Sequence, residues 1–73
     1  MLQVDLKEPD EIIRQFIKDQ CSPYGKVMSV QIHRPTTFAM VTMANHMQTL
    51  ELAGMFGGSA SGTSVLIHLE QKP

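Results

Sequence analysis

The chain has little cysteine, few aromatic residues, few charges and no long hydrophobic run. Its single cysteine excludes an internal disulfide and a cysteine-rich zinc site. No apolar segment approaches the length of about 18 residues that a membrane helix needs. The N-terminus also lacks the basic-then-apolar pattern of a signal peptide. The single cysteine fits a reducing compartment, and we expect an intracellular protein, nuclear or cytoplasmic.

The composition is that of one small folded domain spanning residues 1–73. Hydrophobic residues make up 42% of the chain, which is ordinary for a globular protein. Charged residues make up only 18%, which argues against a disordered tail. The formal net charge is −1 and the isoelectric point about 6.2. This balance argues against avid, nonspecific binding of polyanions, which needs an excess of Lys and Arg.

The segment 38–43 is the centre of the predicted fold, because it alternates strictly between two sides. Ala39 and Val41 would point to one side of a strand, while Phe38 and Met40 would point to the other. We expect this strand to lie in the middle of a sheet, with helices covering the Ala39 side. The Phe38 side would then be open to a ligand.

Hydrophobic periodicity along the rest of the chain predicts three more strands and two helices. Strands are expected over 1–6, 27–33 and 64–70, and helices over 9–21 and 45–56. Pro9 suits the start of the first helix and Asn45 is a plausible cap for the second. The mostly apolar face predicted for the first helix consists of Ile13, Phe16, Ile17, Gln20 and Cys21, which recur at helical spacing. Segment 57–62, rich in glycine and serine, is predicted to be a flexible connection.

The order βαββαβ predicts an α+β fold of the ferredoxin-like type. This is a sandwich of a four-stranded antiparallel sheet with two helices on one face. Strands 27–33 and 38–43 are expected to form a hairpin, because only a tight connection separates them. In this arrangement strands 27–33 and 64–70 lie at opposite edges of the sheet. Many functions use this fold, so the architecture alone does not specify one.

Three segments of the chain carry a family pattern. Segment 21–32 reads Cys-Ser-Pro-Tyr-Gly-Lys-Val-Met-Ser-Val-Gln-Ile, and segment 38–43 reads Phe-Ala-Met-Val-Thr-Met. The first resembles the end of helix one and the second strand of the RNA recognition motif family, and the second resembles that family's eight-residue ribonucleoprotein motif. Segment 2–7 stands in the place of its six-residue motif, so that the chain resembles a degenerate member of the family over nearly its whole length. Departures are also present, since Thr36 and Thr37 stand where the family has a basic residue and glycine. The family's base-stacking positions correspond to Gln3, Phe38 and Met40, of which only Phe38 is aromatic.

The resemblance implies a module that binds single-stranded RNA, with weak or atypical affinity, on the open face of the sheet. Phe38 would stack on a base and Met40 would supply an apolar contact. Hydrogen bonds to bases would come from Gln3, Gln31, His33 and His68. The basic residues Lys7, Arg34 and Lys72 would lie along the RNA backbone. Each polar residue could instead be an ordinary solvated residue of a strand. The Phe38 ring could instead be covered by the C-terminal tail or by a partner.

The alternative function is a protein–protein interaction module on the same fold. The acidic isoelectric point and the missing aromatics favour it, as do Met47 and Leu50, which fall outside the predicted core stripe of their helix. We expect no enzyme, because no paired carboxylates or nucleophile–base pair is present. No cofactor and no metal are expected either, since the three histidines fall on separate elements. A ligand-binding regulatory domain is the remaining class, and stabilisation by amino acids or nucleotides would reveal it.

Overall fold

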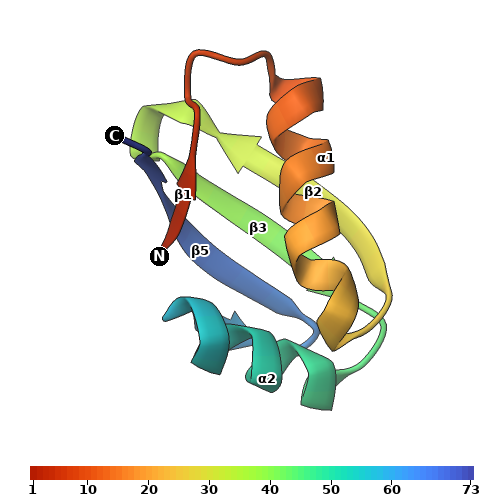
Figure 1. Ribbon diagram of the computed structural model, residues 1–73. Coiled ribbons are helices and arrows are strands. Elements are labelled where there is room, and N and C mark those ends of the chain that lie inside the picture. The colour runs from red at the N-terminus through yellow and green to blue at the C-terminus, as the bar shows by residue number, and fades with distance from the viewer.

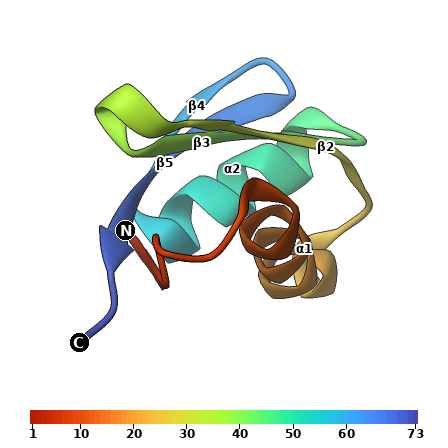
Figure 2. The ribbon, with the colours of Figure 1, turned by 90° about the horizontal axis from the view of Figure 1, so that it is seen from above.

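Two helices cover one face of a five-stranded sheet and leave its other face open (Figures 1 and 2). The computed structural model describes all residues, 1–73. It confirms the α+β class and the placement of both helices on one side of the sheet. The elements in chain order are β1 (Leu2–Val4), α1 (Asp10–Cys21), a 3-10 turn η1 (Ser22–Tyr24), β2 (Val27–His33), a 3-10 turn η2 (Arg34–Thr36), β3 (Phe38–Met43), α2 (His46–Phe56), β4 (Ser59–Ser61) and β5 (Ser64–Gln71).

The strand order differs from the predicted ferredoxin-like sheet. The sheet runs β1-β5-β3-β2, with β4 paired to β5, so it has five strands rather than four. β1 pairs with β5 in parallel, which makes the sheet mixed instead of fully antiparallel. β5 therefore lies beside β3 in the interior, and the prediction that the last strand forms an edge is wrong. The predicted β2–β3 hairpin is confirmed.

β1 is a short strand at the edge of the sheet, next to β5. Three residues of β1 pair with β5. The chain then turns at Asp5, where the backbone N–H of Glu8 donates to the Asp5 carbonyl at 3.1 Å. β5 spans eight residues and pairs with β3 along one edge, while buried and exposed residues alternate along most of its length. Its outer edge is shared by β4 at one end and β1 at the other.

The segment predicted as a flexible connection forms a hairpin instead. Ser59–Ser61 pairs antiparallel with the start of β5, and Gly62 makes the turn with a φ of 61°. That left-handed backbone favours glycine. Gly58 is required by packing, because a Cβ there would lie 2.6 Å from the carbonyl oxygen of Leu66. The glycines that suggest flexibility in the sequence therefore allow a tight hairpin.

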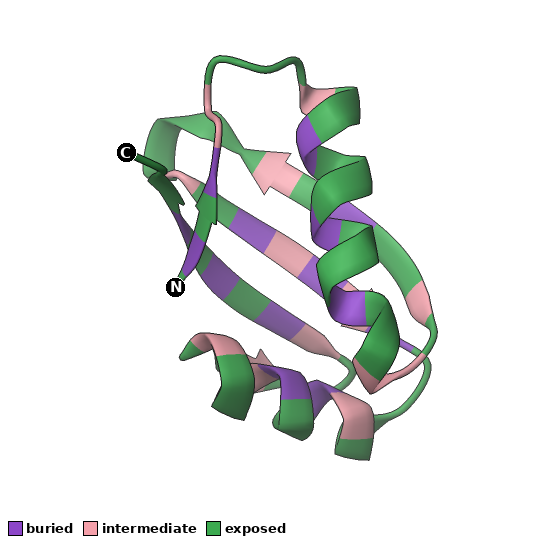
Figure 3. Cartoon of the chain, in the orientation of Figure 1, coloured by how far each residue is buried: buried purple, intermediate pink, exposed green.

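The core lies between the sheet and the helices, and buried residues alternate with exposed ones along β3 and β5 (Figure 3). Phe16 is an exception to the predicted core, since 36% of its surface remains exposed. Phe16 instead borders a surface groove together with Val4 and Ile12. The thirteen buried hydrophobic residues are Leu2, Val4, Ile13, Ile17, Cys21, Val30, Ala39, Val41, Met43, Leu52, Val65, Ile67 and Leu69.

Both helices begin one residue after their predicted starts, at Asp10 and His46, and end at the predicted residues Cys21 and Phe56. Pro9 precedes α1, and Asp10 and Glu11 lie in its first turn, where acidic residues favour the positive end of the helix dipole. The side chain of Asn45 caps α2 by accepting a hydrogen bond from the Gln48 backbone N–H at 2.9 Å. α2 ends at Gly57, whose φ of 67° is the left-handed conformation of a helix C-cap. The two helices are thus set in place by local signals.

Candidate nucleic-acid interface

The open face of the sheet presents two rows of side chains that cross β2, β3 and β5. In the first row His33 pairs with Phe38, and Phe38 pairs with His68. In the second row Gln31, Met40 and Leu66 stand side by side. Side chains of directly paired residues point to the same face of a sheet. The two rows therefore form one continuous surface, which we call the sheet-face site.

Phe38 is the central aromatic residue of the sheet-face site. Its side chain remains 37% exposed, although it lies in an interior strand. The ring centroid is 5.2 Å from that of His68, and the two ring planes are inclined by 40°. The His68 ring therefore packs beside Phe38, and part of the Phe38 side chain remains accessible. A flat planar ligand can stack on such a surface.

A shallow hollow of about 500 Å³ lies beside Phe38. The ring of His33 is oriented at its margin, because its Nδ1 lies 2.7 Å from the hydroxyl of Thr36. Apolar side chains form most of the floor, with amide, hydroxyl and imidazole groups around them. The lining residues are Gln31, Ile32, His33, Thr36, Phe38, Met40 and Leu66. Such a surface suits a planar group with polar edges.

Gln3 is separated from the sheet-face site. It was predicted to stand beside Phe38 and Met40, but it lies on the edge strand β1 and pairs with Glu70. The place next to Phe38 is taken by His68 and the place next to Met40 by Leu66. The alternation of β5 indicated that both residues face outward. The sequence contained no signal that β5 would be the neighbour of β3.

Arg34 is held by its own chain rather than free to bind RNA. Its Nε lies 2.8 Å from an Asp10 carboxylate oxygen, and its Nη atoms donate to the carbonyls of Leu6 and Glu8 at 2.6 and 2.8 Å. These contacts join the turn η2 to the loop after β1. Lys7 lies in that same loop, beyond the edge strand and outside the two rows. The rows themselves contain no Lys or Arg.

Asp5 is fixed at the edge of the sheet near the chain's tail. Its Oδ1 accepts a hydrogen bond from the Lys7 backbone N–H at 3.0 Å and another from Gln71 Nε2 at 3.2 Å. These donors, the backbone N–H above all, lower the pKa of the Asp5 carboxyl from its ordinary value. Asp5 is therefore a stable negative charge near β1, where it repels phosphate.

The other candidate groups, His46 and Cys21, lie on the helices and outside the two rows. No group of three or more His, Cys, Asp or Glu side chains is arranged to hold a metal ion. His46 contacts the Gly62 carbonyl at 2.6 Å and so joins α2 to the β4–β5 turn. The Cys21 thiol is buried, and this burial raises its pKa to about 11. The thiol is thus protonated at neutral pH and is no nucleophile there.

Comparisons of the chain with protein-family models, with curated proteins and with solved structures find no match. Neither helix has the length and apolar character needed to cross a bilayer.

Proposed function

We propose that the protein is an RNA-binding module that holds single-stranded RNA on the sheet-face site. The observation that carries this proposal is the row His33–Phe38–His68, in which an accessible aromatic ring is flanked by two imidazoles. Single-stranded RNA is commonly bound through bases that stack on aromatic side chains, with hydrogen bonds to their edges. Phe38 supplies the stacking surface, and Gln31 and His33 supply polar groups beside it.

The affinity expected from this surface is weak and rests on stacking. Stacking of one base on an aromatic side chain contributes roughly 1–3 kcal/mol. Charge contributes little, because Arg34 is bound to Asp10 and no other cation lies in the rows. Few phosphate contacts also mean a shallow salt dependence. We therefore expect binding to persist at moderate salt and to discriminate little between bases.

We further infer that the chain is a divergent member of the RNA recognition motif family. The β2–β3 hairpin, the two helices on one face and Phe38 on the open face support this inference. The departure is the position of β5, which stands beside β3, while β1 lies at the edge. In such a member the second stacking position would belong to His68 instead of Gln3.

An NMR titration of the isotope-labelled protein with a degenerate pool of short RNA tests the RNA proposal. We expect amide shifts at Gln31, Phe38, Met40 and His68, and a loss of affinity of about tenfold in Phe38→Ala. Met47→Ala is the matched control, because Met47 lies on α2, on the covered side of the sheet. An unchanged affinity in Phe38→Ala, or shifts confined to the helices, would refute the assignment.

A second candidate function is protein binding through the outer face of α2. Three apolar side chains are exposed there, with Met47 74%, Leu50 46% and Met55 59% accessible. Glu51 is the only acidic or basic side chain of this helix, apart from His46 at its start. A photo-crosslinking residue at position 47 would capture a protein that binds this face. Reconstitution of the complex from the two purified proteins then tests this function. Leu50→Glu should abolish that reconstituted complex while leaving RNA binding intact.

A further inference from the structure

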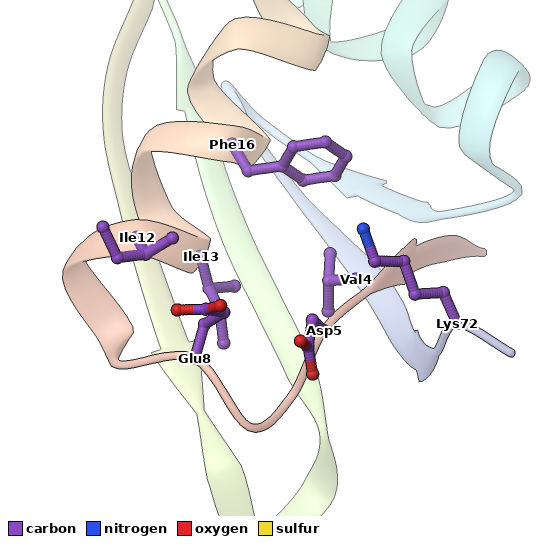
Figure 4. A pocket seen from close by; sticks show the side chains of 7 residues that line it. All are labelled: Val4, Asp5, Glu8, Ile12, Ile13, Phe16 and Lys72. Atoms are coloured by element: carbon purple, nitrogen blue, oxygen red, sulfur yellow. The ribbon is translucent and has the colours of Figure 1, made fainter.

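A groove on the helix side of the molecule lies between β1, the start of α1 and the C-terminal tail (Figure 4). Its volume is about 180 Å³. Val4 and Ile13 form the floor, and the Ile12 and Phe16 side chains stand along the α1 wall. Of these, Ile12 is 54% and Phe16 36% exposed. The groove thus offers an apolar interior that the protein's own core does not fill.

β1 and α1 form two sides of the groove. Val4 of β1 and Ile13 of α1 both line it, and β1 lies at the outer edge of β5. The ends of β1 and β5 curve toward the helix side of the sheet (Figure 2). The C-terminal tail is held against β1 by a hydrogen bond from the Lys72 backbone N–H to the Val4 carbonyl at 3.0 Å. The hollow is therefore a fixed part of the fold between two anchored walls.

The rim of the groove is acidic. Four of the chain's seven acidic residues, Asp5, Glu8, Asp10 and Glu11, stand within the segment 5–11. Arg34 pairs with Asp10 at 2.7 Å, which leaves the others without a side-chain cation partner. Asp5 and Glu8 are the two that line the groove. Hydrogen bonds that favour the charged form of Asp5 keep that side of the rim negative.

Lys72 is the one basic side chain of the groove lining. In Figure 4 its ammonium end reaches across the groove toward Phe16. It offsets part of the acidic charge while the groove is empty. A second cation that enters the groove would meet Lys72 as a like charge and Glu8 as an opposite charge. The contributions of the two residues to the binding of a cationic ligand therefore have opposite signs.

We propose that this groove binds a segment of another protein in which a large apolar side chain stands next to basic residues. The volume is below the roughly 300–1,000 Å³ of small-molecule pockets, so it suits one inserted side chain rather than a whole cofactor. The apolar side chain packs against Phe16, and the neighbouring basic groups pair with Glu8 and Asp5. The partner surface is opposite in charge to the rim, which favours that orientation. This inference concerns a surface separate from the sheet-face site.

The test is an NMR titration of the isotope-labelled protein with three capped peptides. The first carries a Leu flanked by Lys residues, the second has Glu in place of Lys, and the third has Ala in place of Leu. We expect the Lys/Leu peptide to shift the amide resonances of Val4, Ile12 and Phe16. The resonances of Phe38 and Met40 should stay unchanged. The other two peptides should bind at least about tenfold more weakly, because each lacks one of the two required interactions.

Variants of the groove separate its apolar and charged contributions. Phe16→Ala and Ile12→Ala should each weaken binding of the Lys/Leu peptide severalfold. Because the Ile12 side chain is exposed, Ile12→Ala should have little effect on folding. Glu8→Gln should weaken binding, whereas Lys72→Gln should strengthen it. Met28→Ala is the matched control and should change nothing, because Met28 is an exposed apolar residue of β2 that does not line the groove. Thermal unfolding of each variant verifies that the fold is retained.

Several results would overturn the proposal. Equal binding of the Lys and Glu peptides would exclude the acidic rim as a determinant, and equal binding of the Leu and Ala peptides would exclude the apolar groove. Weaker binding by Lys72→Gln would contradict the expected sign. Concentration-dependent self-association that Phe16→Ala removes would assign the groove to a second copy of the chain. If RNA shifted the resonances of Ile12 and Phe16 and none of the peptides did, the groove would be assigned to nucleic acid.

Discussion

The guanidinium group of Arg34 joins two parts of the chain that are distant in sequence. It binds the Asp10 carboxylate together with the carbonyls of Leu6 and Glu8. A planar group with several fixed donors suits such a contact, whereas the single ammonium of lysine reaches fewer acceptors at once. A sequence shows that a residue is basic, but not whether its donors are already occupied. An RNA phosphate would therefore have to compete with these intramolecular contacts for the Arg34 guanidinium.

Replacing Arg34 should affect stability more than RNA binding. We expect Arg34→Ala to lower the free energy of unfolding by about 1 kcal/mol, because the contacts are partly exposed and solvent screens them. Arg34→Lys should restore little of this loss. Urea denaturation measures the change, and Lys26→Ala serves as a control at an exposed cation without such contacts. A large loss of RNA affinity at unchanged stability would instead support the original prediction for Arg34.

Ionisation of Cys21 should couple stability to alkaline pH. The folded state holds the thiol proton up to a pKa of about 11, while the unfolded chain releases it near the ordinary value of 9.0. Between these values the unfolded state binds fewer protons, so the free energy of unfolding falls as the pH rises above about 9. Chemical denaturation across this range measures the slope. Cys21→Ala should remove this contribution, and rapid labelling of the native thiol at neutral pH would contradict its burial.

At the level of elements, local sequence signals predicted most of the helices and strands. β2 and β3 match their predicted bounds, and α2 begins after the predicted cap. These features depend on periodicity and capping, which are properties of neighbouring residues. β1 is shorter than predicted because Asp5 turns the chain, and β4 was missed because its three residues are Ser, Ala and Ser. Short segments of this kind carry no hydrophobic alternation.

The Asn45 cap offers a test of how α2 is set in place. Its Oδ1 accepts the Gln48 N–H at 2.9 Å, and Asn45→Ala leaves that donor without a partner. We expect a loss of about 1 kcal/mol in the free energy of unfolding, with most of it recovered in Asn45→Ser, which also caps. Thermal or urea unfolding measures both variants. Equal stability of Asn45→Ala and the parent would show that the cap contributes nothing.

At the scale of the whole molecule, the strand order should determine the pattern of hydrogen exchange. β3 and β5 have partners on both edges, whereas β1 has one partner over three residues. We expect the slowest amides in β3 and β5, around Val41 and Val65, and fast exchange at Gln3 and Val4. Native-state exchange followed by NMR measures these rates. Slow exchange in β1 together with fast exchange in β5 would support the antiparallel order predicted from the sequence.

The composition of the sheet-face site depends on this order and so was only partly predictable. Alternation within each strand correctly indicated that Phe38, Met40 and His68 lie on the less buried face of the sheet. Which of them become neighbours depends on strand pairing, which is set by competition among distant segments for the same edges. Gln3 was consequently predicted beside Phe38, where His68 stands.

The parallel pairing of β1 with the end of β5 has a mechanical consequence. A force applied to Met1 and Pro73 in opposite directions would slide these two strands along each other. The hydrogen bonds between β1 and β5 would then be loaded in shear and would have to break at the same time, instead of breaking one after another. With the two terminal strands arranged in this way, the molecule would resist stretching from its ends more than its small size suggests.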